Sequence, residues 1–205
     1  MRETERRSWG EASLIRGSGP LWQEATRSRF LDGLAEGSLP ESAFHGWLSQ
    51  DYLFAKGLTT FQAIVLSKAP RDCHNPLISG LTALDSEMDW FERQSRQRGI
   101  ELDAPPHPIC RSYIDFLVRS AYGEPYPVLL AILFGVEVSY LGAWSALEAK
   151  GPYAEFIERW SNPAFVEYVS ALGALAERYP HEGAQRAFDA VLQHERDFWK
   201  MTWES

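Results

Sequence analysis

Hydrophobic residues recur at three- and four-residue spacing along most of the chain, which is the pattern of helices with one apolar side. Proline and glycine residues separate the periodic stretches, and no run of alternating β-branched residues lies between turn signals. The pattern predicts helices over 20–36, 40–67, 76–98, 108–121, 126–149, 153–159, 163–178 and 182–203. We therefore expect an all-α fold in which long helices pack as a bundle.

The chain is expected to form a single domain over 1–205. Its 205 residues suit one large domain, and no internal repeat, low-complexity tract or Pro/Gly-rich linker interrupts them. Hydrophobic residues make up 45% and charged residues 23%, which is ordinary globular usage and disfavours disorder and coiled coils. Residues 1–18 precede the first clear helix and are predicted to be a less ordered N-terminal extension.

Charge and cysteine content narrow the class of partner and compartment. The 20 Lys and Arg against 28 Asp and Glu give a net charge of −8, which disfavours nucleic acid and anionic membranes as partners. Cys73 and Cys110 are too few for a disulfide framework. They lie in or beside Pro-containing turns with no obvious activating histidine and are predicted to be inert. The start lacks the apolar stretch of a secretory signal, and the longest apolar run, 128–134, is too short to cross a bilayer. We expect a cytoplasmic protein.

The most informative stretch is 128–147, which is apolar nearly all round and predicts a central helix about 30 Å long. Glu137 lies in its middle, with no Lys or Arg within nine residues on either side. A carboxylate there must be paired, hydrogen-bonded or protonated. Tyr140 and Trp144 share its face, which is typical of a pocket for a planar polar molecule. A structural acid bonded to a neighbouring helix is the alternative interpretation.

Two further acids lie in aromatic stripes of other helices. Asp51 is three residues before Phe54, and Glu195 is four residues before Trp199, so helical spacing places each acid on the apolar side. A carboxylate at the rim of an aromatic core would explain either acid alone. Three acids from distant segments instead suggest one buried site in which they shift one another's proton affinity.

Other candidates carry weaker signals. Tyr113 and Trp160 are expected to serve packing when taken alone, and Glu87 is expected at the border of its helix, with its role left open. No histidine follows a glutamate by three residues, so no metal site is predicted. The motifs of dinucleotide, P-loop, redox CxxC and serine-hydrolase sites are also absent from the sequence.

Several segments, taken together in their order and spacing, resemble the TenA/thiaminase II family over about 21–203. They are FHGWLSQDYLF, the stretch from SYIDFLV to WSAL, ERWSNPAFVEYV and HERDFW. The resemblance implies a haem-oxygenase-like helical bundle that assembles as a homotetramer or homodimer. It also implies action on a small thiamin-derived aminopyrimidine, without metal, haem or another cofactor.

The resemblance also assigns site residues. The family's pyrimidine-binding aspartate falls on Asp51, its two site tyrosines on Tyr113 and Tyr140, and its proton-handling glutamate on Glu195. Phe54 and Trp160 stand where many members have tyrosine, so they keep a stacking surface but change the hydroxyl contacts.

The nucleophile position departs from the usual thiaminase II pattern. Where most members carry a Pro-Cys pair, this chain has Gly135 and Val136, followed by Glu137. This context is similar to the family's glutamate-type branch, in which a glutamate replaces the cysteine. The resemblance implies a hydrolase of thiamin salvage that acts on aminomethyl aminopyrimidine or its N-formyl form, with Glu137 as nucleophile or base. A non-catalytic pyrimidine-binding or regulatory protein, and an oxygenase or oxidase on the same bundle, are the alternatives.

Overall fold

The computed structural model describes residues 9–204, and its regular secondary structure over this range is helical, with no strand. The all-α prediction is therefore confirmed. The α-helices are α2 (Ser13–Gly17), α3 (Pro20–Thr26), α4 (Arg29–Glu36), α5 (Glu41–Lys68), α6 (His74–Arg98), α7 (Pro108–Gly123), α8 (Tyr126–Ser145), α9 (Ala154–Trp160), α10 (Pro163–Arg178) and α11 (Ala184–Glu204). Two 3-10 turns, η1 (Arg71–Cys73) and η2 (Gly151–Tyr153), precede α6 and α9.

Packing divides the described chain into two compact units. The first holds residues 9–39 and 127–200, and the second holds residues 40–126 and 201–204. Each unit has its own set of packed helices, so each is described by itself. The single domain over 1–205 stays a prediction.

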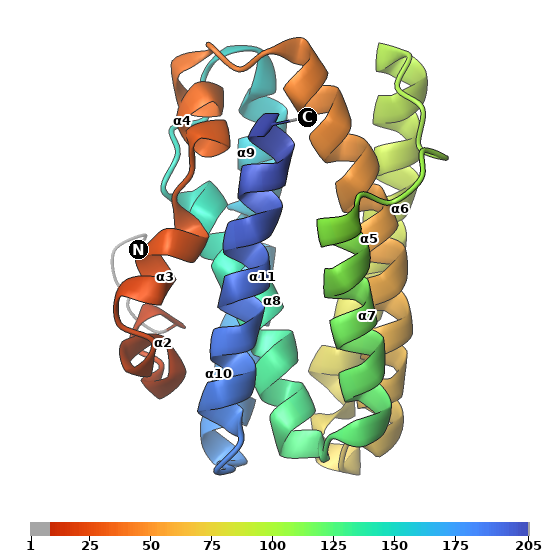
Figure 1. The fold of residues 1–205 in the computed structure, drawn as a ribbon. Coiled ribbons are helices and arrows are strands. Elements are labelled where there is room, and N and C mark those ends of the chain that lie inside the picture. The colour runs from red at the N-terminus through yellow and green to blue at the C-terminus, as the bar shows by residue number, and fades with distance from the viewer. Residues whose placement is uncertain (1–8, 205) are drawn as a thin grey trace. The chain divides into compact units, whose positions relative to one another are not determined.

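In the first unit, α8 and α11 run side by side in the same direction (Figure 1). Their backbones approach closely at Gly135, where an added Cβ would lie 3.2 Å from both Phe188 and Val191. Further along the pair, the rings of Tyr140 and Trp199 stack with centroids 6.1 Å apart. These contacts fix the register of α8 against α11.

In the second unit, α5 packs against α6 and α7 (Figure 1). The connection that leads into α7 is held to α5 by hydrogen bonds: the Ser49 hydroxyl donates to the Glu101 carbonyl at 2.6 Å, and the His107 amide donates to Gln50 Oε1 at 2.7 Å. The start of α7 is thereby set against the middle of α5.

Two predicted helices differ from the structure. The helix expected over 20–36 is broken after Thr26, because Arg27 and Ser28 are extended and the Ser28 side chain caps α4 by accepting a hydrogen bond from the Leu31 amide. The helix expected over 126–149 ends at Ser145. Apolar periodicity continues through both places, so it conceals the cap and the early end.

The predicted N-terminal extension, 1–18, is only partly within the described residues, because 1–8 lie outside them. Residues 9–18 contain α2, with Ile15 buried. The Ser13 amide donates to Glu177 at 2.6 Å and the Ser18 hydroxyl donates to Asp189 at 2.5 Å. This part of the segment is therefore bonded to the rest of its unit.

Helix α8 is, among the described residues, the one that is long and apolar enough to cross a membrane by length and composition. However, 78% of its most apolar window is buried inside the protein. The helix is longer than the unbroken run 128–134 on which the sequence prediction was based. Burial, rather than length, is what distinguishes it from a membrane span.

Replacing Gly135 tests the close approach of α8 to α11. We expect Gly135→Leu to lower the free energy of unfolding by about 2 kcal/mol, because the new side chain must displace Phe188 and Val191. Gly123→Ala is the control, since an added Cβ at Gly123 meets nothing within 4 Å. Urea unfolding of both variants measures the difference, and equal stability would contradict the packing described above.

Candidate functional site

The seven predicted site residues fall into two sets, one in each unit. The first unit holds Glu137, Tyr140, Trp160 and Glu195, and the second holds Asp51, Phe54 and Tyr113.

Solvent reaches the central helix α8 at few places. Between Val128 and Leu141, every residue is buried except Glu137 and Tyr140, which are half-exposed. The two residues are three apart and therefore share a face of the helix. The sequence predicts that an acid in this apolar helix must be paired, hydrogen-bonded or protonated, and the structure leaves Glu137 only partly buried. Partial exposure lowers the cost of a charge.

The Glu137 carboxylate also has a hydrogen-bond donor on another helix. The Tyr168 hydroxyl, on α10, donates to Glu137 Oε1 at 3.5 Å. Sequence reasoning did not single out Tyr168, because the two residues are 31 positions apart and no local spacing pairs them. An acid in an apolar helix needs a partner, and this need was the signal in the sequence. The sequence did not indicate which residue the partner is.

Aromatic rings surround Tyr140. Its ring lies edge-on to Trp160, with centroids 5.4 Å apart, and is nearly parallel to Trp199 at 6.1 Å. Trp144 also contacts Trp160 at 4.7 Å and Trp199 at 6.3 Å. We call these four residues the aromatic cluster. The three tryptophans are buried and Tyr140 is half-exposed, so the cluster backs one partly accessible phenol ring, which could stack on a planar heterocycle.

Glu195 is on α11 and is 5% exposed. It lies between Val191, which packs on Gly135, and Trp199, which stacks on Tyr140. Glu137 lies between the same two contact points on α8. Both acids therefore lie between the same two contact points of the helix pair, Glu137 on α8 and Glu195 on α11.

The second set is built on α5 and α7. Asp51 is 7% exposed and lies one turn before Phe54, whose ring packs on Tyr113 with centroids 4.5 Å apart. Cys110 lies one turn before Tyr113, and its thiol donates to the Gln50 carbonyl at 3.4 Å. The second unit thus groups an acid, a phenol and a phenyl ring.

The cysteines behave as the sequence predicts. Burial, and then the charge of Asp51, raises the pKa of the Cys110 thiol to about 12, so the thiol stays protonated at neutral pH. Cys73 is fully buried, with its thiol directed to Asp72. Neither thiol is therefore available as a nucleophile in this structure.

Two other predictions concern Glu87 and metals. Glu87 is half-exposed on α6, as expected for a residue at the border of its helix, and its role stays open. Over residues 9–204, no group of three or more His, Cys, Asp or Glu side chains is placed to hold a metal ion.

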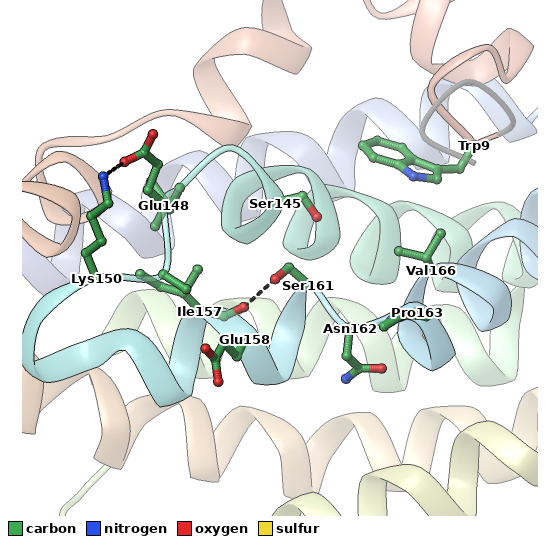
Figure 2. Close-up of a pocket in the computed structure, with 12 residues that line it drawn as sticks. Trp9, Ser145, Glu148, Lys150, Ile157, Glu158, Ser161, Asn162, Pro163 and Val166 are labelled. Carbon is green, nitrogen blue, oxygen red and sulfur yellow. Dashed lines mark hydrogen bonds and ion pairs between the residues drawn. The ribbon is translucent and has the colours of Figure 1, made fainter. Parts of the chain in front are cut away.

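A separate cavity of about 670 Å³ opens around the α9–α10 junction, and none of the seven predicted residues lines it. Figure 2 shows Trp9, Ser145, Ser161 and Val166 around it, with the Glu148–Lys150 ion pair at one end. Its ionic side chains, Glu148, Lys150 and Glu158, are all exposed. The cavity therefore lacks the buried acid that the predicted chemistry needs.

The chain is similar to several known proteins. A probable bifunctional TENA-E protein of Glycine max is 28% identical over 202 residues, covering 89% of this chain and 88% of the relative. An aminopyrimidine aminohydrolase of Halalkalibacterium halodurans is 23% identical, covering 94% of each chain. A solved TenA homologue from Pyrococcus furiosus superposes with a TM-score of 0.86 at 29% identity, covering 93% of this chain and 98% of that one.

The likeness to solved structures confirms the predicted haem-oxygenase-like bundle. The TENA/THI-4/PQQC family model matches residues 18–205, which is nearly the whole chain. The chain therefore belongs to the TENA/THI-4/PQQC family.

Proposed function

We propose that the protein is an aminopyrimidine hydrolase of thiamin salvage, of the glutamate-type branch. Its substrate is aminomethyl aminopyrimidine, or the N-formyl form, derived from degraded thiamin. The observation that carries the proposal is the pair Glu137 and Tyr140, which alone reach solvent in the buried middle of α8 and lie beside the aromatic cluster. The relative named aminopyrimidine aminohydrolase supports the substrate class.

Glu137 and Glu195 have different roles in the proposed hydrolysis. Glu137 activates water or attacks the substrate carbon directly, and Glu195 delivers a proton to the departing nitrogen. For the aminomethyl substrate, water replaces the amino group and ammonia leaves; for the formyl substrate, water adds to the formyl carbon and formate leaves. Burial of Glu195 and solvent contact of Glu137 give the two carboxyl groups different environments, which separates an acid from a base.

The remaining residues hold the ring. Tyr140 and Trp160 supply a stacking surface and, from Tyr140, a hydroxyl. Asp51 accepts hydrogen bonds from the amino group of the pyrimidine. Tyr113, like Tyr140, donates a hydrogen bond to the substrate, and Phe54 closes a face of the ring. We also propose, on the family resemblance, a homotetramer or homodimer in the cytoplasm that uses no metal or other cofactor.

Glu137→Gln tests the central role. We expect kcat on both pyrimidines to fall at least about 100-fold, because the amide can neither accept the proton nor attack. Glu167→Gln is the matched control, since Glu167 is exposed on α10 and should leave the rate unchanged. Release of ammonia or formate, followed with purified protein, provides the measurement.

Two results would overturn the proposal. Equal rates for wild type and Glu137→Gln would mean that Glu137 takes no part in the reaction. Calorimetric binding of the pyrimidine without any product after long incubation would instead identify a binding protein.

Asp51→Asn tests recognition of the ring. We expect KM to rise about 10-fold with a smaller change in kcat, because an amide loses a charge-assisted hydrogen bond to the substrate's amino group. Asp115→Asn on the exposed side of α7 is the control. An unchanged KM for Asp51→Asn would exclude Asp51 from substrate binding.

Alkylation tests whether a thiol takes part. With a pKa of about 12, Cys110 is ionised in only about one molecule in 10⁵ at pH 7, and this fraction rises as the pH increases. We expect the native protein to keep its activity and mass after iodoacetamide treatment at pH 7, whereas the unfolded chain gains two labels, one for each cysteine. Mass spectrometry and the activity assay together give the answer, and rapid inactivation of the native protein would refute the thiol-free reaction.

A further inference from the structure

We propose that Tyr168 is a positioning residue, whose hydroxyl orients the Glu137 carboxylate for the hydrolytic step. The inference rests on the proposed function of Glu137, and it adds a residue for which the sequence suggested no role. Its basis is the contact between two helices of the first unit, α10 and α8.

The contact joins side chains that are both half-exposed. Tyr168 Oη donates to Glu137 Oε1 at 3.5 Å, which is long for such a bond but places the phenol directly on the carboxylate. Bonds at catalytic groups are often long without substrate and shorten when the substrate binds. The phenol is thus placed to act on one defined oxygen of Glu137.

The backbone of α10 holds Tyr168 in place. At the start of the helix, the Asn162 side chain caps it by accepting from the Phe165 amide at 3.0 Å. Further along, Gly173 lies against α8, where an added Cβ would be 3.1 Å from the Phe134 ring. Because Gly173 meets Phe134 and Tyr168 meets Glu137, the two helices are antiparallel. Tyr168 lies between the cap and this close contact.

A phenol suits this task chemically. A glutamate side chain has three torsions, and the last of them is broad, so an unanchored carboxylate samples many orientations. A neutral donor fixes one oxygen and favours the ionised carboxylate without cancelling its charge, as a lysine ammonium group would. The carboxylate therefore stays available as nucleophile or base while its direction is set.

Tyr168→Phe removes only the hydroxyl. We expect kcat to fall about 10-fold with KM unchanged, because the bond acts on the reacting carboxylate and not on the bound ring. Tyr179→Phe is the matched control at the other end of α10, where the ring contacts Arg178. A merely structural role for Tyr168 would lower the melting temperature but leave kcat unchanged, and that outcome would overturn the inference.

A double-mutant cycle separates this inference from the proposed function. Glu137→Asp withdraws the carboxylate from Tyr168 by one methylene, so adding Tyr168→Phe should cost no further activity. Independent losses that multiply would contradict the coupling. Crystal structures of wild type and Tyr168→Phe add a readout that needs no turnover: an unchanged Glu137 orientation refutes the inference. A wild type that turns over neither pyrimidine refutes the proposed function instead.

Discussion

Close packing of helix α8 within the first unit governs the chemistry available to this protein. Gly135 and Gly173 allow α11 and α10 to approach α8 until ring and aliphatic atoms lie at van der Waals contact. Such contact excludes water from almost the whole middle of the helix. The exceptions are Glu137 and Tyr140, which share one face of α8. The packing that stabilises the unit therefore leaves one polar strip on this helix.

In the function that we propose, the Glu137 carboxylate takes the role that the family resemblance gives to a thiol in the usual members. A thiolate is a stronger nucleophile, but it must be stabilised by a lowered pKa. The thiol of Cys110 has the opposite environment, since burial and the Asp51 charge both oppose its ionisation. The acid and base roles in the proposed reaction therefore fall to Glu137 and Glu195 rather than to a thiol.

The sequence predicted the helices well where apolar spacing and Pro or Gly boundaries agreed, as at α10, whose bounds match the predicted 163–178. It failed at Ser28 because a serine cap inside an amphipathic stretch leaves the apolar period intact. It named Glu137 and Tyr140 from their isolation in an apolar helix. It could not show that solvent reaches them, or that Tyr168 contacts Glu137, because both follow from how separate helices pack.

The division of the chain has a consequence for its synthesis. Helices α5, α6 and α7 follow one another, so the second unit's contacts can form as soon as these segments leave the ribosome. The first unit joins residues 9–39 to 127–200, and α8 is covered in part by α11, which is made after it. Until α11 emerges from the ribosome, the most apolar segment of the chain therefore lacks a main packing partner and exposes apolar surface that favours aggregation.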